Sequence, residues 1–448
     1  MKRFALVLLL ALLLLAACGP AEQTEYTEEE PLTLRSFYGV IDGWDGGMLT
    51  LSDEQGASHT LYAGRAVVCG KYPPEEGCPA EISVAENGPP DAALRVRVLA
   101  PPADKVLVRQ LLDAMTLEQK AGQMFLARCP ELDAAELAAR LHLGGYVLFA
   151  RDFAGRTPEQ VQAETAAYQQ AADLPLYIAV DEEGGDVVRI SRYGAFRSSP
   201  FPSQQSLYAA GGLDALAADA REKSALLRSL GINVDLAPVA DVSTSPADFM
   251  YSRTLGQSAA VTAEGVAVQV RELQQGGVSA TLKHFPGYGS NADTHTGVVT
   301  DTRPAAVFYE QDLLPFRAGC DAGAGFVLVS HNIVTAFDGN MPASLSPAVH
   351  ALLRQELGFS GLIITDDLAM GGVAQLYGVE ETAVLAVLAG NDMLLSSDPE
   401  RQLRSVLEAV ESGRVSRDLI DRAVERILLA KIGAGLIELP KTDWAAYK

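Results

Sequence analysis

Short, continuous apolar runs alternate with long amphipathic stretches over most of the chain. Such runs are typical of strands that are buried on both faces of a parallel sheet. The stretches between them have the apolar spacing of helices, and several end in glycine, as a helix C-cap does. Eight β-then-α units predict a (β/α)8 barrel, the TIM-barrel form of the α/β class, over residues 103–448. The eight runs cover residues 122–127, 144–150, 175–181, 232–241, 278–287, 325–332, 361–368 and 391–397.

An open, doubly wound sheet is the alternative arrangement of the same units. It usually has fewer strands, and its first strand is followed by a GxGxxG phosphate loop. No such motif follows the first run, so the pattern favours the barrel.

The preceding segment, residues 32–100, has a different pattern. Short stretches of alternating apolar and polar residues are separated by Asp-Gly and Gly-Gly pairs, which favour hairpin turns. Near its end, ALRVRVLAPP predicts a strand that stops at proline. We expect a small all-β barrel or sandwich. Because no acids, bases or ligands gather in this segment, its expected role is that of a spacer or binding module.

The first residues, MKRFALVLLLALLLLAACGP, have the pattern of a secretory signal. A positive start precedes an apolar run, Phe4–Ala17, that is short for a membrane-spanning helix. The run ends in LAAC, which resembles a bacterial lipobox, in which the thiol of Cys18 accepts diacylglycerol. We expect residues 1–17 to be a lipoprotein signal peptide and residues 18–31 an acidic tether. The protein is then extracytoplasmic and lipid-anchored to the bacterial cell membrane; an ordinary signal peptide or an uncleaved anchor is the alternative.

The formal net charge of −22 at pH 7 narrows the range of partners. Nucleic-acid binding needs clustered Lys and Arg to displace counterions, and a polybasic membrane-binding face needs them too. We therefore expect no nucleic-acid partner. With 48% hydrophobic and 21% charged residues, the composition instead fits a large packed core, and we expect a monomer.

Five cysteines occur in the chain. Cys69 and Cys78 flank a turn-rich stretch, and either a disulfide or two free thiols fits this pattern. Cys129 and Cys320 are expected to be small core residues. Since no Cys/His spacing resembles a zinc site, we expect no metal, and no organic cofactor is implied.

Polar residues stand at the ends of five predicted strands. The catalytic residues of a (β/α)8 barrel lie at the carboxyl ends of its strands, so these side chains are expected to share one pocket. Each alone also fits a helix N-cap or a solvated surface charge. The chain has no Walker, HExxH or GxSxG motif, whereas carboxylates with cationic donors are the equipment of glycosyl transfer to water. The strand-end residues are Asp181; Asp241, with Arg253 in the loop after it; Lys283 and His284; His331 and Asn332; and Asp366 and Asp367.

The segment KHFPGYGSNADTHTG adds a candidate for proton transfer. Asp293 and His295 are separated by one residue in this glycine-rich stretch. A histidine titrates near neutral pH and serves as either acid or base, and an aspartate beside it orients the ring and stabilises its charged form. The pair is therefore a candidate acid/base, with an ordinary polar loop as the alternative.

These motifs resemble glycoside hydrolase family 3, specifically its β-N-acetylglucosaminidase branch. KHFPGYG with DTH, followed by TDDLAM, carries the resemblance. The stretches MTLEQKAGQMF, AVDEEGG, GINVDLAPVADV, SRTLG, DLLPFRAG and AGNDMLL agree with it. The resemblance covers residues 104–437 and none of the β segment before them.

The resemblance implies a retaining, exo-acting β-N-acetylhexosaminidase that removes terminal β-linked GlcNAc from glycans or from cell-wall fragments, as in peptidoglycan recycling. Asp366 matches the family's nucleophile. His295, paired with Asp293, matches the acid/base of this branch. The positions that match those holding the non-reducing sugar are Asp181, Arg253, Lys283 and His284, with Arg189 as a weaker match.

Two positions depart from the family pattern. Tyr288 replaces the second histidine of the usual KHFPGHG, and we expect it to change the packing beneath the loop. Asp186 replaces the arginine after EGG, which reverses a charge near the pocket mouth and disfavours anionic, muropeptide-like substrates. A family 3 β-glucosidase or β-xylosidase, or a non-catalytic sugar-binding lipoprotein, is the alternative function. Phosphate in place of water is a conceivable acceptor.

Overall fold

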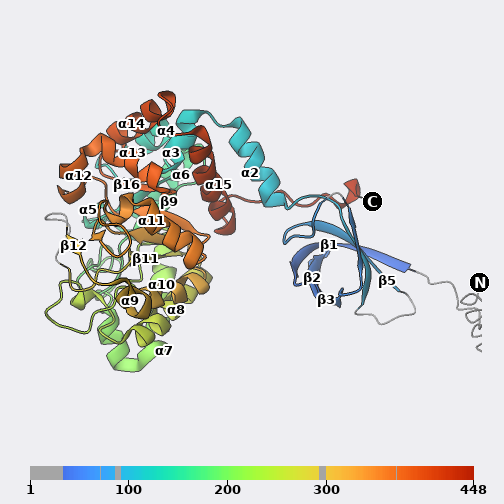
Figure 1. Cartoon of the computed structure of the whole chain (residues 1–448), viewed down its shortest axis with the longest axis horizontal. Coiled ribbons are helices and arrows are strands. Elements are labelled where there is room, and N and C mark those ends of the chain that lie inside the picture. The colour runs from blue at the N-terminus through green and yellow to red at the C-terminus, as the bar shows by residue number, and fades with distance from the viewer. Residues whose placement is uncertain (1–33, 71, 86–91, 292–298, 370, 448) are drawn as a thin grey trace, which may run out of the picture. The chain divides into compact units, whose positions relative to one another are not determined.

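The computed structural model describes residues 34–70, 72–85, 92–291, 299–369 and 371–447. Contacts divide the chain into two units (Figure 1). One unit spans Asp104–Pro440, and the other contains the described residues before Asp104 together with those after Pro440.

The smaller unit is a six-stranded sheet with the order β3-β2-β1-β5-β6-β4, which confirms the predicted small all-β domain. Neighbouring strands are antiparallel, except that β4 runs parallel to β6. Ile41, Leu51, Ile82 and Val96 are part of its buried apolar core. The strands are β1 (Leu34–Trp44), β2 (Met48–Asp53), β3 (Ser58–Tyr62), β4 (Val67–Gly70), β5 (Pro79–Ala85) and β6 (Ala93–Val98).

The cysteines of the described residues are free thiols. No disulfide therefore joins Cys69 and Cys78, the pair that the sequence left open. Cys78 is buried, whereas Cys69 is half-buried and accepts a hydrogen bond from Nε of Arg95 at 3.3 Å. In the larger unit Cys129 is buried in the core and Cys320 packs against it, as expected for small core residues.

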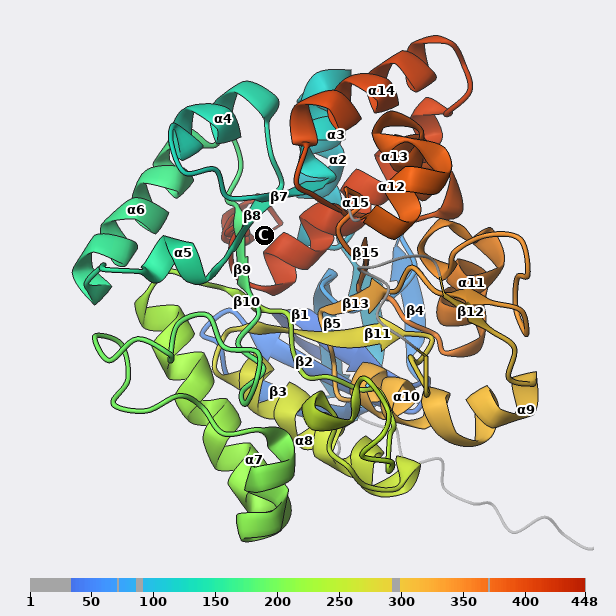
Figure 2. The same ribbon diagram turned by 90° about the vertical axis from the view of Figure 1, so that its left-hand side faces the viewer.

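The larger unit is an eight-stranded parallel barrel, as predicted. Its strand order is β15-β13-β11-β10-β9-β8-β7-β16, and a bridge links Ile364 of β15 to Met393, the residue directly before β16. Figure 2 shows the helices of this unit arranged around the strands. Each strand falls in one predicted apolar run, and only β7 extends past the end of its run. The strands are β7 (Phe125–Arg128), β8 (Gly145–Leu148), β9 (Tyr177–Val180), β10 (Val234–Asp235), β11 (Ser279–Phe285), β13 (Phe326–Val329), β15 (Leu362–Thr365) and β16 (Leu394–Ser396).

Several helices begin at side chains that cap their first backbone N–H groups. Thr116 and Gln119 form a reciprocal capping box, and so do Thr157 and Gln160. Within the described residues, no helix combines the length and the apolar character needed to cross a membrane. The helices are α2 (Ala103–Ala114), α3 (Leu117–Gln123), α4 (Ala134–Leu141), α5 (Ala150–Phe153), α6 (Pro158–Ala171), α7 (Gln204–Ser229), α8 (Ala259–Gln275), α9 (Ala305–Val307), the π-helix η2 (Phe308–Asp312), α10 (Leu313–Asp321), α11 (Pro347–Ala351), the π-helix η4 (Leu352–Glu356), α12 (Gly371–Tyr377), α13 (Val379–Ala389), α14 (Pro399–Glu411) and α15 (Arg417–Gly433).

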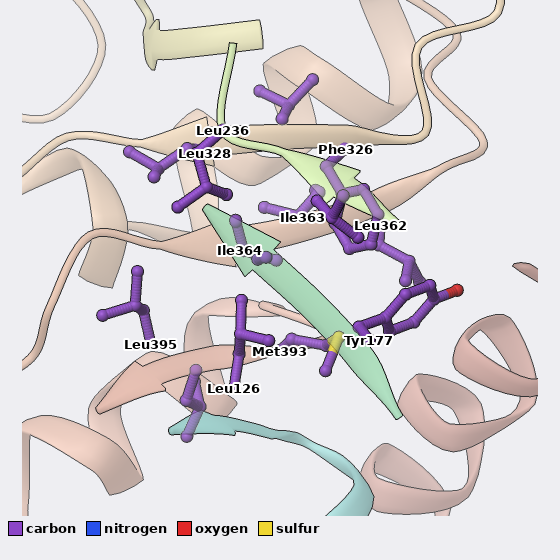
Figure 3. Packing of buried hydrophobic residues seen from close by; sticks show 14 of the residues in the cluster. Leu126, Tyr177, Leu236, Phe326, Leu328, Leu362, Ile363, Ile364, Met393 and Leu395 are labelled. Carbon is purple, nitrogen blue, oxygen red and sulfur yellow. The ribbon is translucent and has the colours of Figure 1, made fainter. Parts of the chain in front are cut away.

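Apolar side chains from many strands fill the core of the barrel unit (Figure 3). The ring of Tyr177 meets that of Phe326 edge to face, with 5.1 Å between the ring centres. Ile363, Ile364 and Met393 are completely buried in the same cluster. Because both faces of each strand are covered, successive positions are apolar, and continuous runs rather than alternating patterns mark the strands in the sequence.

Candidate active site

Four strands deliver polar side chains to the carboxyl edge of the barrel. Asp181 follows β9, and Asp241 lies beyond the end of β10. Lys283 and His284 lie in the second half of β11, and Asp366 directly follows β15. Because the strands are parallel and paired along the barrel, their carboxyl ends lie on the same edge.

Lys283 lies at the centre of a buried ionic group. Its Nζ is 2.7 Å from Oδ1 of Asp181 and 2.6 Å from Oε1 of Glu183. Arg253 donates to the same Glu183 carboxylate from Nε at 2.9 Å and from Nη2 at 2.6 Å. We call Asp181, Glu183, Arg253 and Lys283 the Lys283 network. Three of its members were predicted from the sequence; Glu183 was missed, although AVDEEGG places it two residues after Asp181.

Charge pairing, rather than burial, decides the ionisation of this network. Burial opposes the charge on Glu183, but Lys283 and Arg253 outweigh it and lower the pKa of Glu183 to about 2. Burial also opposes the charge on Lys283, yet Asp181 and Glu183 raise the pKa of that ammonium group. The network therefore holds fixed charges of both signs at neutral pH.

Glu183→Gln is expected to destabilise the protein by on the order of 3 kcal/mol at neutral pH. A carboxyl group whose pKa is lowered on folding stabilises the fold above its ordinary value of 4.5, and this contribution is lost as the pH falls through about 2. Denaturant unfolding of the unmodified protein and of Glu183→Gln across this pH range measures the difference in their free energies of unfolding. This difference must become smaller as the pH falls. Glu222→Gln is the matched control, since Glu222 pairs with Arg197 at the surface and should lose at most about 1 kcal/mol. An equal loss in both variants at pH 7 would contradict the prediction.

His284 is held by Asp241 in one orientation. Oδ2 of Asp241 lies 2.7 Å from Nδ1 of His284 and accepts the backbone N–H of the same residue at 3.1 Å. On the other side of the ring, Nε2 lies 3.4 Å from Nη2 of Arg253. Because a guanidinium has only donors, this arrangement favours the proton on Nδ1 and leaves Nε2 as an acceptor beside the Lys283 network.

Arg189 lies at the outer side of the Lys283 network. Its Nη2 is 3.6 Å from Oδ2 of Asp181, the carboxylate that also binds Lys283. Its guanidinium is 5.8 Å from the ring centre of Phe149, over which Arg128 is also placed, at 4.8 Å. The structure thus brings together all five residues predicted to hold the sugar: Asp181, Arg189, Arg253, Lys283 and His284.

The two aspartates after β15 have different surroundings. Asp367 accepts hydrogen bonds from the backbone N–H groups of Ala369 and Ser397 at 3.0 and 3.1 Å, and from the hydroxyl of Ser397. Asp366 is half-buried, and its Oδ1 accepts the backbone N–H of Asp367 at 2.9 Å. His331 is buried and lies 3.1 Å from the carbonyl oxygen of Asp367 through Nε2. Asp367 and His331 therefore fix the turn that carries Asp366.

Three predicted residues, Cys18, Asp293 and His295, lie outside the described residues. The described positions on either side of residues 292–298 are joined to each other. Nδ2 of Asn291 donates to Oδ2 of Asp301 at 2.8 Å.

Comparison with known proteins identifies the family. The model of the "Glycosyl hydrolase family 3 N terminal domain" matches residues 116–430. The chain belongs to glycosyl hydrolase family 3. As the sequence motifs predicted, it is a glycoside hydrolase built on a (β/α)8 barrel.

Similar proteins of family 3 include curated relatives and solved structures. A "Beta-hexosaminidase" from Xanthomonas campestris pv. campestris (strain B100) is 36% identical over 322 residues, covering 70% of this chain and 96% of the relative. The "Beta-hexosaminidase LpqI" of Mycobacterium tuberculosis is 32% identical over 310 residues, covering 67% and 78%. A family 3 beta-N-acetylglucosaminidase structure from Paenibacillus sp. str. FPU-7 matches with a TM-score of 0.67 and 34% identity, over 74% of this chain and 65% of that one.

The two departures from the family 3 pattern take different places in the structure. Tyr288 is buried with Val239 and Met250, and its ring lies edge-on to that of His284, with 5.6 Å between centres. It therefore packs against a residue of the candidate site. Asp186 is exposed.

Proposed function

We propose that this family 3 hydrolase is a retaining, exo-acting β-N-acetylhexosaminidase that releases terminal β-linked GlcNAc from glycans or cell-wall fragments. The observation that carries the proposal is the Lys283 network, placed with His284 at the strand ends of the barrel. Fixed charged donors and acceptors suit the several hydroxyl groups of one sugar. The names of the relatives and the Asp293–Thr294–His295 motif support an N-acetylated sugar rather than glucose.

The reaction proceeds in two half-reactions. In the first, a carboxylate oxygen of Asp366 attacks the anomeric carbon while His295 protonates the glycosidic oxygen, and the bond to the leaving group breaks. In the second, His295 accepts a proton from water, whose oxygen attacks the same carbon and releases Asp366. The two inversions together retain the β configuration. Asp293 orients the imidazole and stabilises its charged form.

The Lys283 network binds the sugar through the hydrogen-bond donors and acceptors that are not used within the network itself. An ammonium group has three N–H bonds, and Lys283 uses two of them on Asp181 and Glu183. The third N–H provides a donor for sugar hydroxyls, and Oδ2 of Asp181 provides an acceptor. Because these groups are fixed before substrate binds, they position the anomeric carbon with little loss of conformational entropy.

The test compares hydrolysis of an aryl β-GlcNAc with that of the matching aryl β-glucoside by the full chain. The proposal predicts a higher kcat/KM for the aryl β-GlcNAc than for the aryl β-glucoside. It also predicts that NMR detects the β anomer of free GlcNAc as the first product. Equal or faster turnover of the glucoside would assign the chain to the β-glucosidase type. The absence of turnover of either would favour a sugar-binding role. Release of a sugar 1-phosphate when phosphate is added would identify phosphate as the acceptor.

We also propose that Cys18 carries a lipid that anchors the protein outside the cytoplasm. The support is the LAAC sequence at the end of an apolar run, followed by an acidic segment. Metabolic labelling with a fatty-acid analogue, with Cys18→Ala as the control, tests this. Labelling that survives the substitution would overturn the proposal.

A further inference from the structure

Arg303 connects several parts of the carboxyl edge of the barrel. Its Nε and Nη2 donate to Oδ2 of Asp301 at 2.9 and 2.8 Å. Its Nη1 donates to Oδ2 of Asp312 at 2.9 Å, and Nη2 lies 3.5 Å from the carbonyl oxygen of Gly287. The guanidinium also stacks 4.3 Å from the ring centre of Phe308. Only a planar group with several fixed donors serves this many partners at once.

These partners belong to both flanks of residues 292–298. On the C-terminal flank, Asp301 ends β12 (Thr300–Asp301), which pairs with β14 (Ile333–Val334). On the N-terminal flank, the backbone at Gly289 lies so close to Arg303 that a Cβ there would clash with the guanidinium. The hydrogen bond from Asn291 to Asp301 joins the two flanks directly. Arg303 therefore fixes the two described ends of this segment relative to each other.

Asp312 ties the same arrangement to a helix. It is the last residue of η2 and directly precedes α10, and its side chain is 2% exposed. A Cβ at Gly287 would clash with its carboxylate, so the backbone before Tyr288 rests on Asp312. Both flanks are thus held against a packed helix of the barrel through one guanidinium.

We propose that Arg303 is a positioning residue for acid/base catalysis. By fixing both described flanks of residues 292–298 against η2 and α10, it sets the two points between which the chain that includes Asp293 and His295 runs. This inference rests on the proposed function, which assigns proton transfer to His295. Arg303 itself touches no reacting atom in this scheme.

Arg303→Lys separates this role from a general effect on stability, because lysine keeps the charge and loses the planar fork. The kcat/KM values of the full chain are measured on phenyl β-GlcNAc, whose leaving group needs a proton, and on 2,4-dinitrophenyl β-GlcNAc, whose leaving group departs without one. We expect a loss of about 100-fold on the phenyl substrate and less than about tenfold on the dinitrophenyl substrate. Equal losses on both substrates, or no loss on either, would overturn the inference.

Arg354→Lys is the matched control. Arg354 pairs with the buried Asp392 and donates to the carbonyl oxygens of Phe359 and Gly361, all near the amino ends of β15 and β16. Its replacement should lower the thermal unfolding midpoint and change kcat/KM by the same factor on both substrates. If Arg303→Lys does not fold by circular dichroism, Asp301→Asn is measured in the same way, with the same expected difference between the substrates.

His295→Ala distinguishes the failure of this inference from the failure of the proposed function. If His295→Ala lowers kcat/KM by the same factor on both substrates, the acid/base assignment is wrong, and so is the proposed role of Arg303. A different result separates the two claims: His295→Ala lowers kcat/KM only on the phenyl substrate, while Arg303→Lys lowers it equally on both. In that case the acid/base assignment stands and only the positioning role of Arg303 is wrong.

Discussion

Asp366→Ala is expected to reduce kcat on aryl β-GlcNAc by about 10⁴-fold or more, because loss of a nucleophile removes the covalent route altogether. Asp366 follows β15 directly, and its backbone N–H donates to the carbonyl oxygen of Val329 on the neighbouring β13 at 3.1 Å. This places the carboxylate on a rigid strand end rather than on a long loop. Steady-state kinetics, with the thermal unfolding midpoint as a check on folding, measure the effect.

Asp367→Asn is the matched control for this substitution. Asp367 is the adjacent carboxylate, and it is engaged with Ala369 and Ser397. Its replacement should lower the unfolding midpoint but leave kcat within about tenfold of that of the unmodified protein. The reason is that the proposed mechanism gives Asp367 no part in stabilising the transition state. Turnover that survives Asp366→Ala, or an equal loss in a folded Asp367→Asn variant, would contradict the nucleophile assignment.

His295→Ala should have the second largest effect, a loss of about 10²- to 10⁴-fold in kcat/KM on phenyl β-GlcNAc. The loss should be small on the 2,4-dinitrophenyl substrate in the first half-reaction, where no proton is needed. Added azide should restore turnover, because azide attacks the glycosyl-enzyme without a base and forms the glycosyl azide. The pH profile of kcat/KM should also lose the limb that reports deprotonation of the acid.

Asp293→Asn provides a graded comparison. In the proposed role of Asp293, an amide would still orient the imidazole of His295 but would no longer stabilise its positive charge. The loss should therefore be smaller than that of His295→Ala and should follow the same dependence on the leaving group. A wild-type pH profile in His295→Ala would place the acid/base at another residue.

The barrel was predictable from the sequence because its strands are buried on both faces. Residues 326–329 and 362–365 are apolar at nearly every position, and the eight runs of this kind predicted the number of strands. The small all-β domain was predictable for a different reason, since its short alternating stretches are separated by turn residues such as Asp45-Gly46-Gly47 between β1 and β2. The pair Asp42-Gly43 instead lies within β1.

The contacts within the site were less predictable than its members. Asp181 and Lys283 were expected at strand ends and Arg253 in the loop after the fourth strand, but Glu183, the carboxylate that Arg253 and Lys283 share, was not predicted. These two partners lie 70 and 100 positions away from it in the chain. Its neighbour Glu182 has the same residue type, yet it is buried among backbone N–H groups of residues 189–191. Composition and spacing alone do not distinguish the two glutamates, because the difference depends on which way each side chain points.

The most direct test of the account is to trap the glycosyl-enzyme. The full chain is incubated with a 5-fluoro N-acetylglucosaminyl fluoride, a substrate whose fluorine slows the second half-reaction so that the intermediate accumulates, and is then digested and analysed by mass spectrometry. The account predicts one added sugar on the peptide that contains Asp366, and none in the Asp366→Ala variant. A label on a different residue, or turnover of the reagent with no covalent species at any time, would contradict it.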